Sequence, residues 1–195
     1  MKNKKIIFVT SNRHKVEEMQ EVLKEYGIEL QQLNRGYPED KEAKIEEVAQ
    51  GAVKILADEV GKEVIVEDTG LYFEAYHNFP GPLPKFVFQG IGFEGIFRLL
   101  KGKSRRAFFK TVIGYCSPGQ EPLIFSGIMR GTIIEEVRAP EADVMPYDHI
   151  FIPDGYSRVI AKMSLKEKNS FSQRAQATRQ LGEYLRNQQT AAVNY

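Results

Sequence analysis

One stretch of this 195-residue sequence constrains the fold more than any other, a β-branched run that leads directly into two acidic residues. Residues 64–66 (VIV) are typical of a buried strand, and Glu67 and Asp68 follow them. The next two residues, Thr69 and Gly70, predict a turn. Open α/β folds bind ligands at strand ends, and Mg²⁺ takes one or two carboxylates together with water and phosphate oxygens. The stretch therefore suits a metal site at the edge of a sheet, and a solvated turn explains it equally well.

A proline-rich segment follows the acidic residues. The run FPGPLPK at residues 79–85 has too many prolines for regular structure and predicts a stiff loop that ends in Lys85. A cation close to an acidic strand end suits a phosphate that is bound together with a metal ion. The alternative interpretation is a rigid connection without a ligand.

The first helix is predicted from Arg13 to Tyr26, and Ser11 and Asn12 precede it where an N-cap belongs. Its first turn holds three consecutive basic residues, which is unusual because the N-terminus of a helix is partly positive. Backbone amides and Lys15 could together cradle a phosphate at this position. We favour this interpretation over a solvated basic turn.

The remaining pattern predicts one α/β domain that covers residues 1–195 and mixes helices with long strands. Residues 106–116 and 123–136 predict an antiparallel hairpin, and the tail after Arg186 is expected to fray. Helices are expected at residues 42–60, around residues 96–100, and from an N-cap at Ser170 to Leu185. Further strands are expected at residues 5–10, 28–33, 148–153 and 156–162.

Composition narrows the class of protein. A net charge of +1 gives no reason to expect nucleic acid or an anionic membrane as partner. The single cysteine, Cys116, rules out a disulfide within the chain and a cysteine-based metal site. Only residues 6–9 are apolar after the basic N-terminus, too few for an export signal, and no run is long enough to span a membrane. We therefore expect a cytoplasmic globular protein.

Five motifs, taken together, resemble the inosine triphosphate pyrophosphatase family. They occur in the family's order and extend over nearly the whole chain, which makes them far more specific than any single motif. The motifs are Thr10-Ser11-Asn12-x-x-Lys15, Glu67-Asp68-Thr69-Gly70-Leu71, Phe79-Pro80-Gly81-Pro82-x-x-Lys85, Phe151-x-Pro153-Asp154-Gly155, and Glu167-Lys168-Asn169 with Ser172-x-Arg174.

The resemblance implies an elongated, two-lobed α/β fold with a central mixed sheet, flanking helices and a deep substrate cleft. It implies Mg²⁺-dependent hydrolysis of ITP, dITP and XTP to the monophosphate and pyrophosphate, and it implies a homodimer. By position it assigns metal binding to Glu39 and Asp68, and catalysis to Asp68, Lys15 and Glu67, the last as a base that lies behind the metal ligands or acts through the metal. The substrate-binding residues that it implies are Thr10, Ser11, Asn12, Lys15, Thr69, Lys85, Tyr147, Asp148, Lys168, Gln173 and Arg174.

Hydrogen-bonding chemistry agrees with such a base pocket. Hypoxanthine and xanthine present a carbonyl acceptor at C6 and a donor at N1, whereas adenine presents the reverse pair. Arg174 or Lys168 at the carbonyl, with Asp148 accepting the N1 proton, would leave adenine with mismatched polar groups. Guanine shares the C6 and N1 pattern, so these residues do not exclude it.

The chain departs from the family pattern in the base motifs. Gln173 stands where the family usually has histidine, and Met145 stands where it has a stacking aromatic. His149 follows Asp148 where the family often has proline, and we expect it to be a local structural residue. These departures bear on base selectivity more than on hydrolysis, because the phosphate and metal motifs are intact. The alternatives are a related pyrophosphatase of altered or broad base specificity and a nucleotide-binding homologue without turnover.

Overall fold

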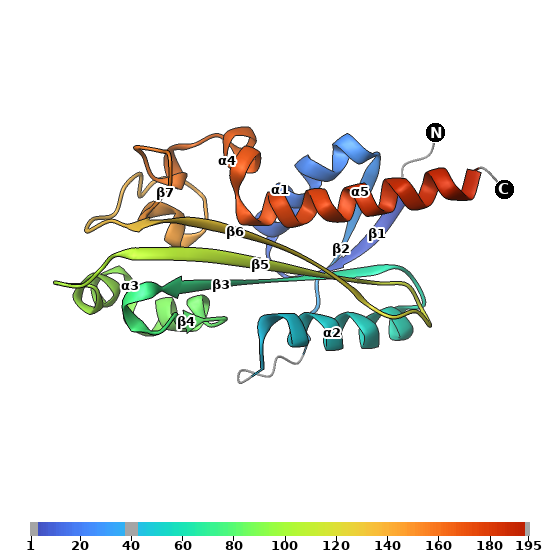
Figure 1. Ribbon diagram of the computed structural model, residues 1–195, viewed down its shortest axis with the longest axis horizontal. Helices are drawn as coiled ribbons and strands as arrows, with labels where there is room; N and C mark the ends of the chain where they lie inside the picture. The colour runs from blue at the N-terminus through green and yellow to red at the C-terminus, as the bar shows by residue number, and fades with distance from the viewer. Residues whose placement is uncertain (1–3, 38–42, 194–195) are drawn as a thin grey trace.

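The structure is a computed structural model that describes residues 4–37 and 43–193. A mixed sheet of seven strands runs through the molecule in the order β2-β1-β3-β5-β6-β7, and β4 pairs with β3 (Figure 1). β1 is parallel to β2 and to β3, and the other pairings are antiparallel. The strands are β1 (Lys4–Val9), β2 (Ile28–Leu33), β3 (Val64–Phe73), β4 (Phe79–Gly81), β5 (Arg106–Cys116), β6 (Leu123–Ile133) and β7 (Phe151–Pro153).

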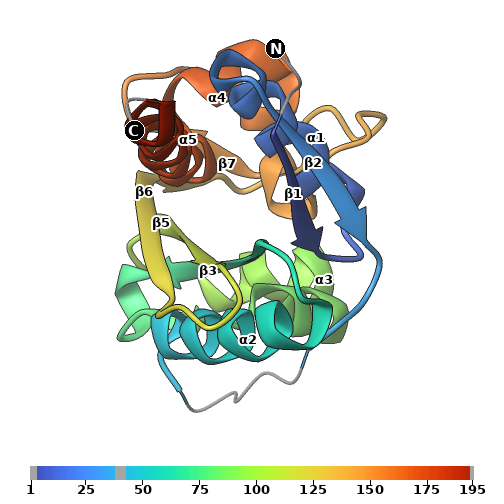
Figure 2. The same ribbon diagram turned by 90° about the vertical axis from the view of Figure 1, so that its right-hand side faces the viewer.

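Helices cover both faces of this sheet. In Figure 2, α2 lies on one side of the strands, and α1, α4 and α5 lie on the other. Within the described residues, none of these helices combines the length and the apolar character that crossing a bilayer requires. The helices are α1 (Arg13–Leu23), α2 (Ile45–Val60), α3 (Pro84–Leu99), α4 (Leu165–Phe171) and α5 (Gln173–Val193), and short 3₁₀ turns include η3 (Pro146–His149) and η4 (Ile160–Lys162).

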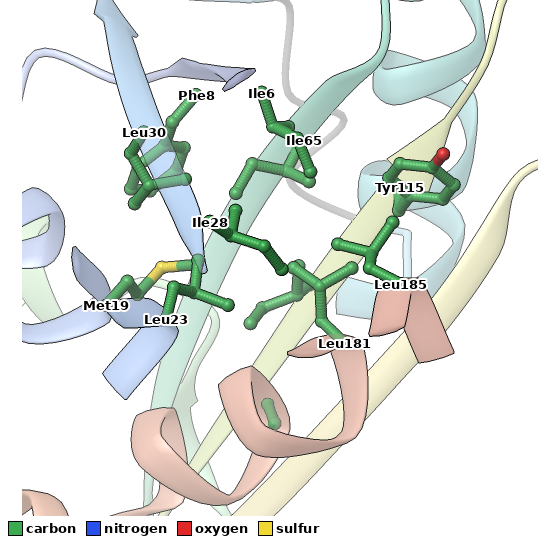
Figure 3. Packing of buried hydrophobic residues seen from close by; sticks show 12 residues of the cluster. Ile6, Phe8, Met19, Leu23, Ile28, Leu30, Ile65, Tyr115, Leu181 and Leu185 are labelled. Atoms are coloured by element: carbon green, nitrogen blue, oxygen red, sulfur yellow. The ribbon is translucent and has the colours of Figure 1, made fainter. Parts of the chain in front are cut away.

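The two faces of β1 show why the sheet is covered on both sides. Successive side chains of a strand point to opposite faces. Ile6 and Phe8 therefore pack under α1 and α5, whereas Ile7 and Val9 pack against α2. Figure 3 shows the first of these cores, which includes Ile6, Phe8, Met19, Leu23, Ile28, Leu30, Ile65, Tyr115, Leu181 and Leu185.

A second lobe forms where β3, β5 and β6 extend beyond β1 and β2 (Figure 1). Leu71 and Phe73 at the end of β3 are fully buried there, and α3 and β7 pack around them with Ile96 and Phe151. The three long strands thus connect the apolar cores of the two lobes. The molecule is elongated and two-lobed, as the resemblance implies.

The turn predicted at Thr69 and Gly70 is absent. β3 continues to Phe73 and pairs with β5 along its whole length. Gly70 is needed for a close approach instead, because a Cβ atom there would lie 2.7 Å from the Gly81 carbonyl oxygen. Glu67 and Asp68 therefore lie in the middle of a strand and point to opposite faces of the sheet.

The proline-rich segment is also more regular than predicted. Residues 79–81 form the short strand β4, and Pro84 begins α3 in the first turn, where its missing N–H would be unpaired in any helix. The helix predicted around residues 96–100 is the second half of α3. Gly92, with φ of 59°, separates the two halves.

Two strands were expected near the C-terminus. The one at residues 148–153 is shorter than predicted, and the one at residues 156–162 is wrong. Only Phe151–Pro153 is a strand, whereas residues 146–149 and 160–162 are 3₁₀ turns. Pro153 ends the strand, because proline has no N–H to donate to a ladder hydrogen bond.

The C-terminal helix begins later and extends further than predicted. The Ser172 hydroxyl accepts a hydrogen bond from the Ala175 amide at 3.3 Å, so Ser172 caps α5. The Ser170 hydroxyl, the predicted cap, donates to the Glu167 carbonyl of the preceding helix α4 instead. α5 continues to Val193, so it includes most of the tail after Arg186 that was expected to fray. The early strands and the long hairpin lie where they were predicted, although β6 ends at Ile133 and not at residue 136. The first helix ends at Leu23, and a 3₁₀ turn continues it to Tyr26.

Candidate functional site

A cleft of about 630 Å³ opens where the first turn of α1, the middle of β3, the start of α3 and η3 meet. Every predicted site residue within the described ranges lines it, and Glu39 lies outside the described residues. The predicted residues that line the cleft are Thr10, Ser11, Asn12, Lys15, Glu67, Asp68, Thr69, Lys85, Tyr147, Asp148, Lys168, Gln173 and Arg174.

The first turn of α1 is shaped by Asn12. Its Oδ1 accepts hydrogen bonds from the amides of His14 (3.0 Å) and Lys15 (3.4 Å), so Asn12 is the N-cap. The Thr10 hydroxyl accepts the Asn12 amide at 3.2 Å and holds the turn. The side chain of Asn12 thus occupies two of the amides that were expected to cradle a phosphate. Lys15 remains directed into the cleft.

Glu67 forms the buried floor of the cleft. Its Oε2 lies 2.5 Å from the Lys15 ammonium, and its Oε1 lies 3.1 Å from Nε of Arg174. The Thr69 hydroxyl donates to Oε1 at 2.5 Å. Burial alone would raise the pKa of Glu67, but the two cations and these hydrogen bonds lower it to about 2. Glu67 is therefore a carboxylate at neutral pH and holds both cations in place.

A second buried ion cluster lies behind the floor, and Glu18 of α1 is its centre. Its carboxylate lies 2.8 Å from the Lys168 ammonium and 2.5 Å from the Arg174 guanidinium. Burial alone would raise the pKa of Glu18, but Arg174 and Lys168 lower it. Lys168 also lies 2.6 Å from Asp148, whose pKa is raised by its own burial. Two acids on α1 and β3 thus share one guanidinium.

Asp68 faces the other side of β3. Its two oxygens lie 2.9 and 3.0 Å from the hydroxyl of Tyr37, which follows β2. Lys15 and Arg174 already neutralise Glu67, so we consider Asp68 the carboxylate of this pair that suits a metal ion. No group of three or more histidine, cysteine or acidic side chains in residues 4–37 and 43–193 could hold a metal. One carboxylate together with substrate phosphates fits Mg²⁺ better than a dedicated protein cage does.

The base side of the cleft is built from η3 and the start of α5. The Tyr147 hydroxyl donates to the Pro84 carbonyl at 3.0 Å and ties η3 to α3. The Asn12 amide group donates to the Met145 sulfur at 3.6 Å, so the residue in place of the stacking aromatic contacts the phosphate side. Gln173 is 5% exposed, and its Oε1 has no hydrogen-bond partner among the described residues.

Close packing brings α5 to this position. A Cβ atom on Gly127 of β6 would lie 2.1 Å from the Gln173 carbonyl oxygen, so a larger residue would push the start of α5 away from the sheet.

Lys85 lies in the exposed first turn of α3, at the edge of the cleft. His149 is buried and its Nδ1 lies 3.1 Å from the Arg138 carbonyl oxygen, in agreement with a local structural role.

Sequence reasoning missed Glu18 and Tyr37. Glu18 lies three residues after Lys15 on α1, which places both on one side of the helix. The spacing was visible in the sequence, but the burial that makes an acid unusual at this position was not. Tyr37 carried no signal, because its contact with Asp68 joins residues 31 positions apart.

The chain is similar to proteins of known family. It matches the sequence model of the Ham1 family over residues 6–184. The dITP/XTP pyrophosphatase of Methanopyrus kandleri is 41% identical over 94% of this chain and 97% of the relative. That of Pyrococcus horikoshii is 39% identical over 93% of this chain and 97% of the relative. The structure of a HAM1 protein from Coxiella burnetii superposes with a TM-score of 0.77 at 26% identity, covering 93% of this chain and 98% of that one.

Proposed function

This chain belongs to the Ham1 family, and from that membership we infer that it is a nucleoside triphosphate pyrophosphatase for deaminated purine nucleotides. It hydrolyses dITP, XTP and ITP to the monophosphate and pyrophosphate, and so removes these nucleotides from the pool. The observation that carries this proposal is the convergence of the phosphate motifs and the base motifs on one cleft. The Ham1 family match confirms the family resemblance that the sequence motifs indicated.

The phosphate end of the cleft contains the groups that phosphoryl chemistry needs. Lys15 and Lys85 line it from α1 and α3, and both can neutralise phosphate oxygens. Asp68, with Glu39 as a second carboxylate, would hold Mg²⁺, which would supply further positive charge next to the phosphoryl group. Asn12 keeps the first turn of α1 in shape beneath the triphosphate.

Glu67 acts as a positioning residue in this proposal. A carboxylate with a pKa of about 2 is a poor proton acceptor at neutral pH, because general bases work best with a pKa near the operating pH. Its contacts with Lys15 and Arg174 instead fix one cation for the phosphates and one for the base. Thr69 supports the same carboxylate.

The base end reads the C6 and N1 edge of the purine. Lys168 and Arg174 carry the donors, and Glu18 holds both of them at fixed positions. Asp148 and the Oε1 of Gln173 supply acceptors. Adenine would place its amino group against the cations and leave buried donors unpaired, which a hydrogen-bonding site penalises strongly.

We also propose a single domain, a homodimer and a cytoplasmic location. The long strands β3, β5 and β6 pass through both lobes, so the two cores are expected to unfold together. A single cooperative transition in calorimetry tests the domain count, and sedimentation equilibrium tests the dimer.

The decisive experiment is a panel of ITP, dITP, XTP, GTP and ATP with Mg²⁺, analysed by chromatography of the products. The expected result is monophosphate and pyrophosphate, with the deaminated purines preferred. Diphosphate and orthophosphate as products would contradict the reaction type. Tight binding of dITP without turnover would instead favour a nucleotide-binding homologue.

A further inference from the structure

One side-chain contact in the cleft, between Tyr37 and Asp68, has no role in the chemistry described above. The Tyr37 hydroxyl lies 2.9 Å from Oδ1 and 3.0 Å from Oδ2 of a carboxylate that is 31 residues away in sequence. We propose that Tyr37 is a positioning residue for the metal-binding carboxylate, and that its hydroxyl orients Asp68 for Mg²⁺. The inference rests on the proposed function, because it presumes that Asp68 binds the metal.

The hydroxyl has one proton and faces two equivalent acceptors. Its proton can go to only one carboxylate oxygen at a time, so Tyr37 itself does not block the approach of a metal ion to the other oxygen. Mg²⁺ needs near-ideal octahedral geometry, so the rotation of a carboxylate ligand about its side-chain bonds matters for affinity. A hydrogen bond to the second oxygen fixes that rotation. Outer-shell partners of this kind commonly change metal affinity by roughly 10–100-fold.

Both partners contact well-packed parts of the fold. Asp68 lies in the centre of β3, paired with Val112 of β5. The Tyr37 side chain packs against the apolar cluster under α2, whose members include Val9 and Val66. The hydroxyl therefore reaches Asp68 from a ring that core residues contact. Ligands that are preorganised by packed neighbours bind metals more tightly than mobile ones do.

The Tyr37 ring could instead serve packing alone, with the hydroxyl contact having no effect on the metal. The variant Tyr37→Phe separates the two roles, because it keeps the ring and removes only the hydroxyl. Tyr76→Phe is the matched control. The Tyr76 hydroxyl donates to the Leu99 carbonyl, and Tyr76 does not line the cleft.

The experiment titrates the full-length protein with Mn²⁺ in the presence of a saturating dITP analogue that cannot be hydrolysed, because substrate phosphates complete the metal site, and electron paramagnetic resonance follows the bound Mn²⁺. Tyr37→Phe is expected to weaken Mn²⁺ binding by roughly 10-fold or more, and Tyr76→Phe to leave it unchanged. In the dITP assay, Tyr37→Phe is expected to need more Mg²⁺ and to recover its turnover at saturating Mg²⁺. A fold defect would not be corrected by the metal.

Equal Mn²⁺ affinity in wild type and Tyr37→Phe would overturn the inference. So would a wild-type protein that binds no Mn²⁺, or one whose Mn²⁺ binding survives Asp68→Asn, because the metal would then lie elsewhere. These outcomes are distinct from failure of the proposed function. Pyrophosphate release from dITP by the wild-type protein tests the function without reference to Tyr37.

Discussion

Glu18 of α1 and Arg174 of α5 form a buried ion pair, with Oε2 and Nη1 2.5 Å apart although 156 residues separate them in sequence. Arg174 is 3% exposed and also pairs with Glu67 of β3. Burial alone would lower the pKa of Arg174, but the two carboxylates raise it. The guanidinium that we propose to face the base is thus held from two elements of the fold, and its orientation depends on both.

The first prediction follows from this pair. Glu18→Gln is expected to destabilise the protein by about 3 kcal/mol, because it leaves Lys168 and Arg174 short of one buried counter-charge. It is also expected to lower kcat/KM for dITP by roughly 100-fold through misplacement of both cations. Glu17→Gln is the matched control, since the neighbouring Glu17 side chain is 56% exposed. Thermal unfolding and dITP kinetics of both variants measure the two effects. Equal behaviour of the two variants would remove Glu18 from the site.

Asp68→Asn is expected to lower turnover by at least roughly 100-fold while the protein stays folded, because the amide keeps the shape but loses the negative charge that a metal needs. Pyrophosphate release and circular dichroism are the measurements. Asp58→Asn serves as control, because Asp58 is an exposed residue of α2 outside the cleft that accepts the Gly119 amide. Near-normal turnover of Asp68→Asn in Mg²⁺ would show that this carboxylate does not bind the metal.

Local signals explain what was predictable from the sequence. The cap of α1 depends on Asn12 and on amides two and three residues later, and the end of the first helical segment depends on Gly27 in the left-handed conformation. Such features are contained within a few residues, so their pattern is visible without the fold. The positions of the site residues came from five motifs whose order could be recognised along the chain.

Long-range packing explains what was not predictable. Gly70 has the local pattern of a turn, but the requirement that selects it is the approach of the Gly81 backbone across the β3–β4 pair. The same error concealed that Glu67 and Asp68 point to opposite faces. The partners of Glu67 come from 52 and 107 residues away, and neither spacing is a helical or strand period. Such contacts become visible only when the sheet has been assembled.

The low pKa of Glu67 predicts how the free energy of unfolding depends on pH in the acidic range. In the folded protein the pKa is about 2, against 4.5 for an ordinary glutamate, so the unfolded chain binds the proton more readily. Stability from this group is therefore complete above about pH 5 and is lost as the pH falls from 4.5 towards 2. The full contribution is about 3 kcal/mol, or about 1.4 kcal/mol for each pH unit in that window.

Chemical denaturation of wild type and Glu67→Gln between pH 5 and pH 2.5 measures this slope. The variant cannot take up the proton, so its free energy of unfolding is expected to fall less steeply over the window. Its stability at pH 7 is expected to be lower, because Lys15 and Arg174 lose a buried partner. Parallel slopes for the two proteins would mean that Glu67 has an ordinary pKa.

The last prediction concerns Gln173, whose buried Oε1 has no partner among the described residues although it lines the cleft. A glutamine amide is neutral and can turn to present either a donor or an acceptor, so it suits a carbonyl or an amino group. Histidine titrates near neutrality and, when protonated, only donates. We expect dITP to remain preferred over dATP through Arg174 and Asp148, but by a smaller margin than in Gln173→His. A hydrogen bond from a charged donor is worth about 1.5–3 kcal/mol, roughly 10- to 150-fold in selectivity.

The measurement is kcat/KM for dITP, XTP, dGTP and dATP in the wild type and in Gln173→His, at a pH low enough to protonate the new histidine. Gln180→His is the matched control, because Gln180 lies on the exposed side of the same helix and its amide donates to Ser126 outside the cleft. The ratio of dITP to dATP is expected to rise in Gln173→His and to stay constant in Gln180→His. Raising the pH through the titration of the histidine should then reduce the gain, because the added donor charge disappears. An unchanged ratio at every pH would place Gln173 outside the contacts that select the base.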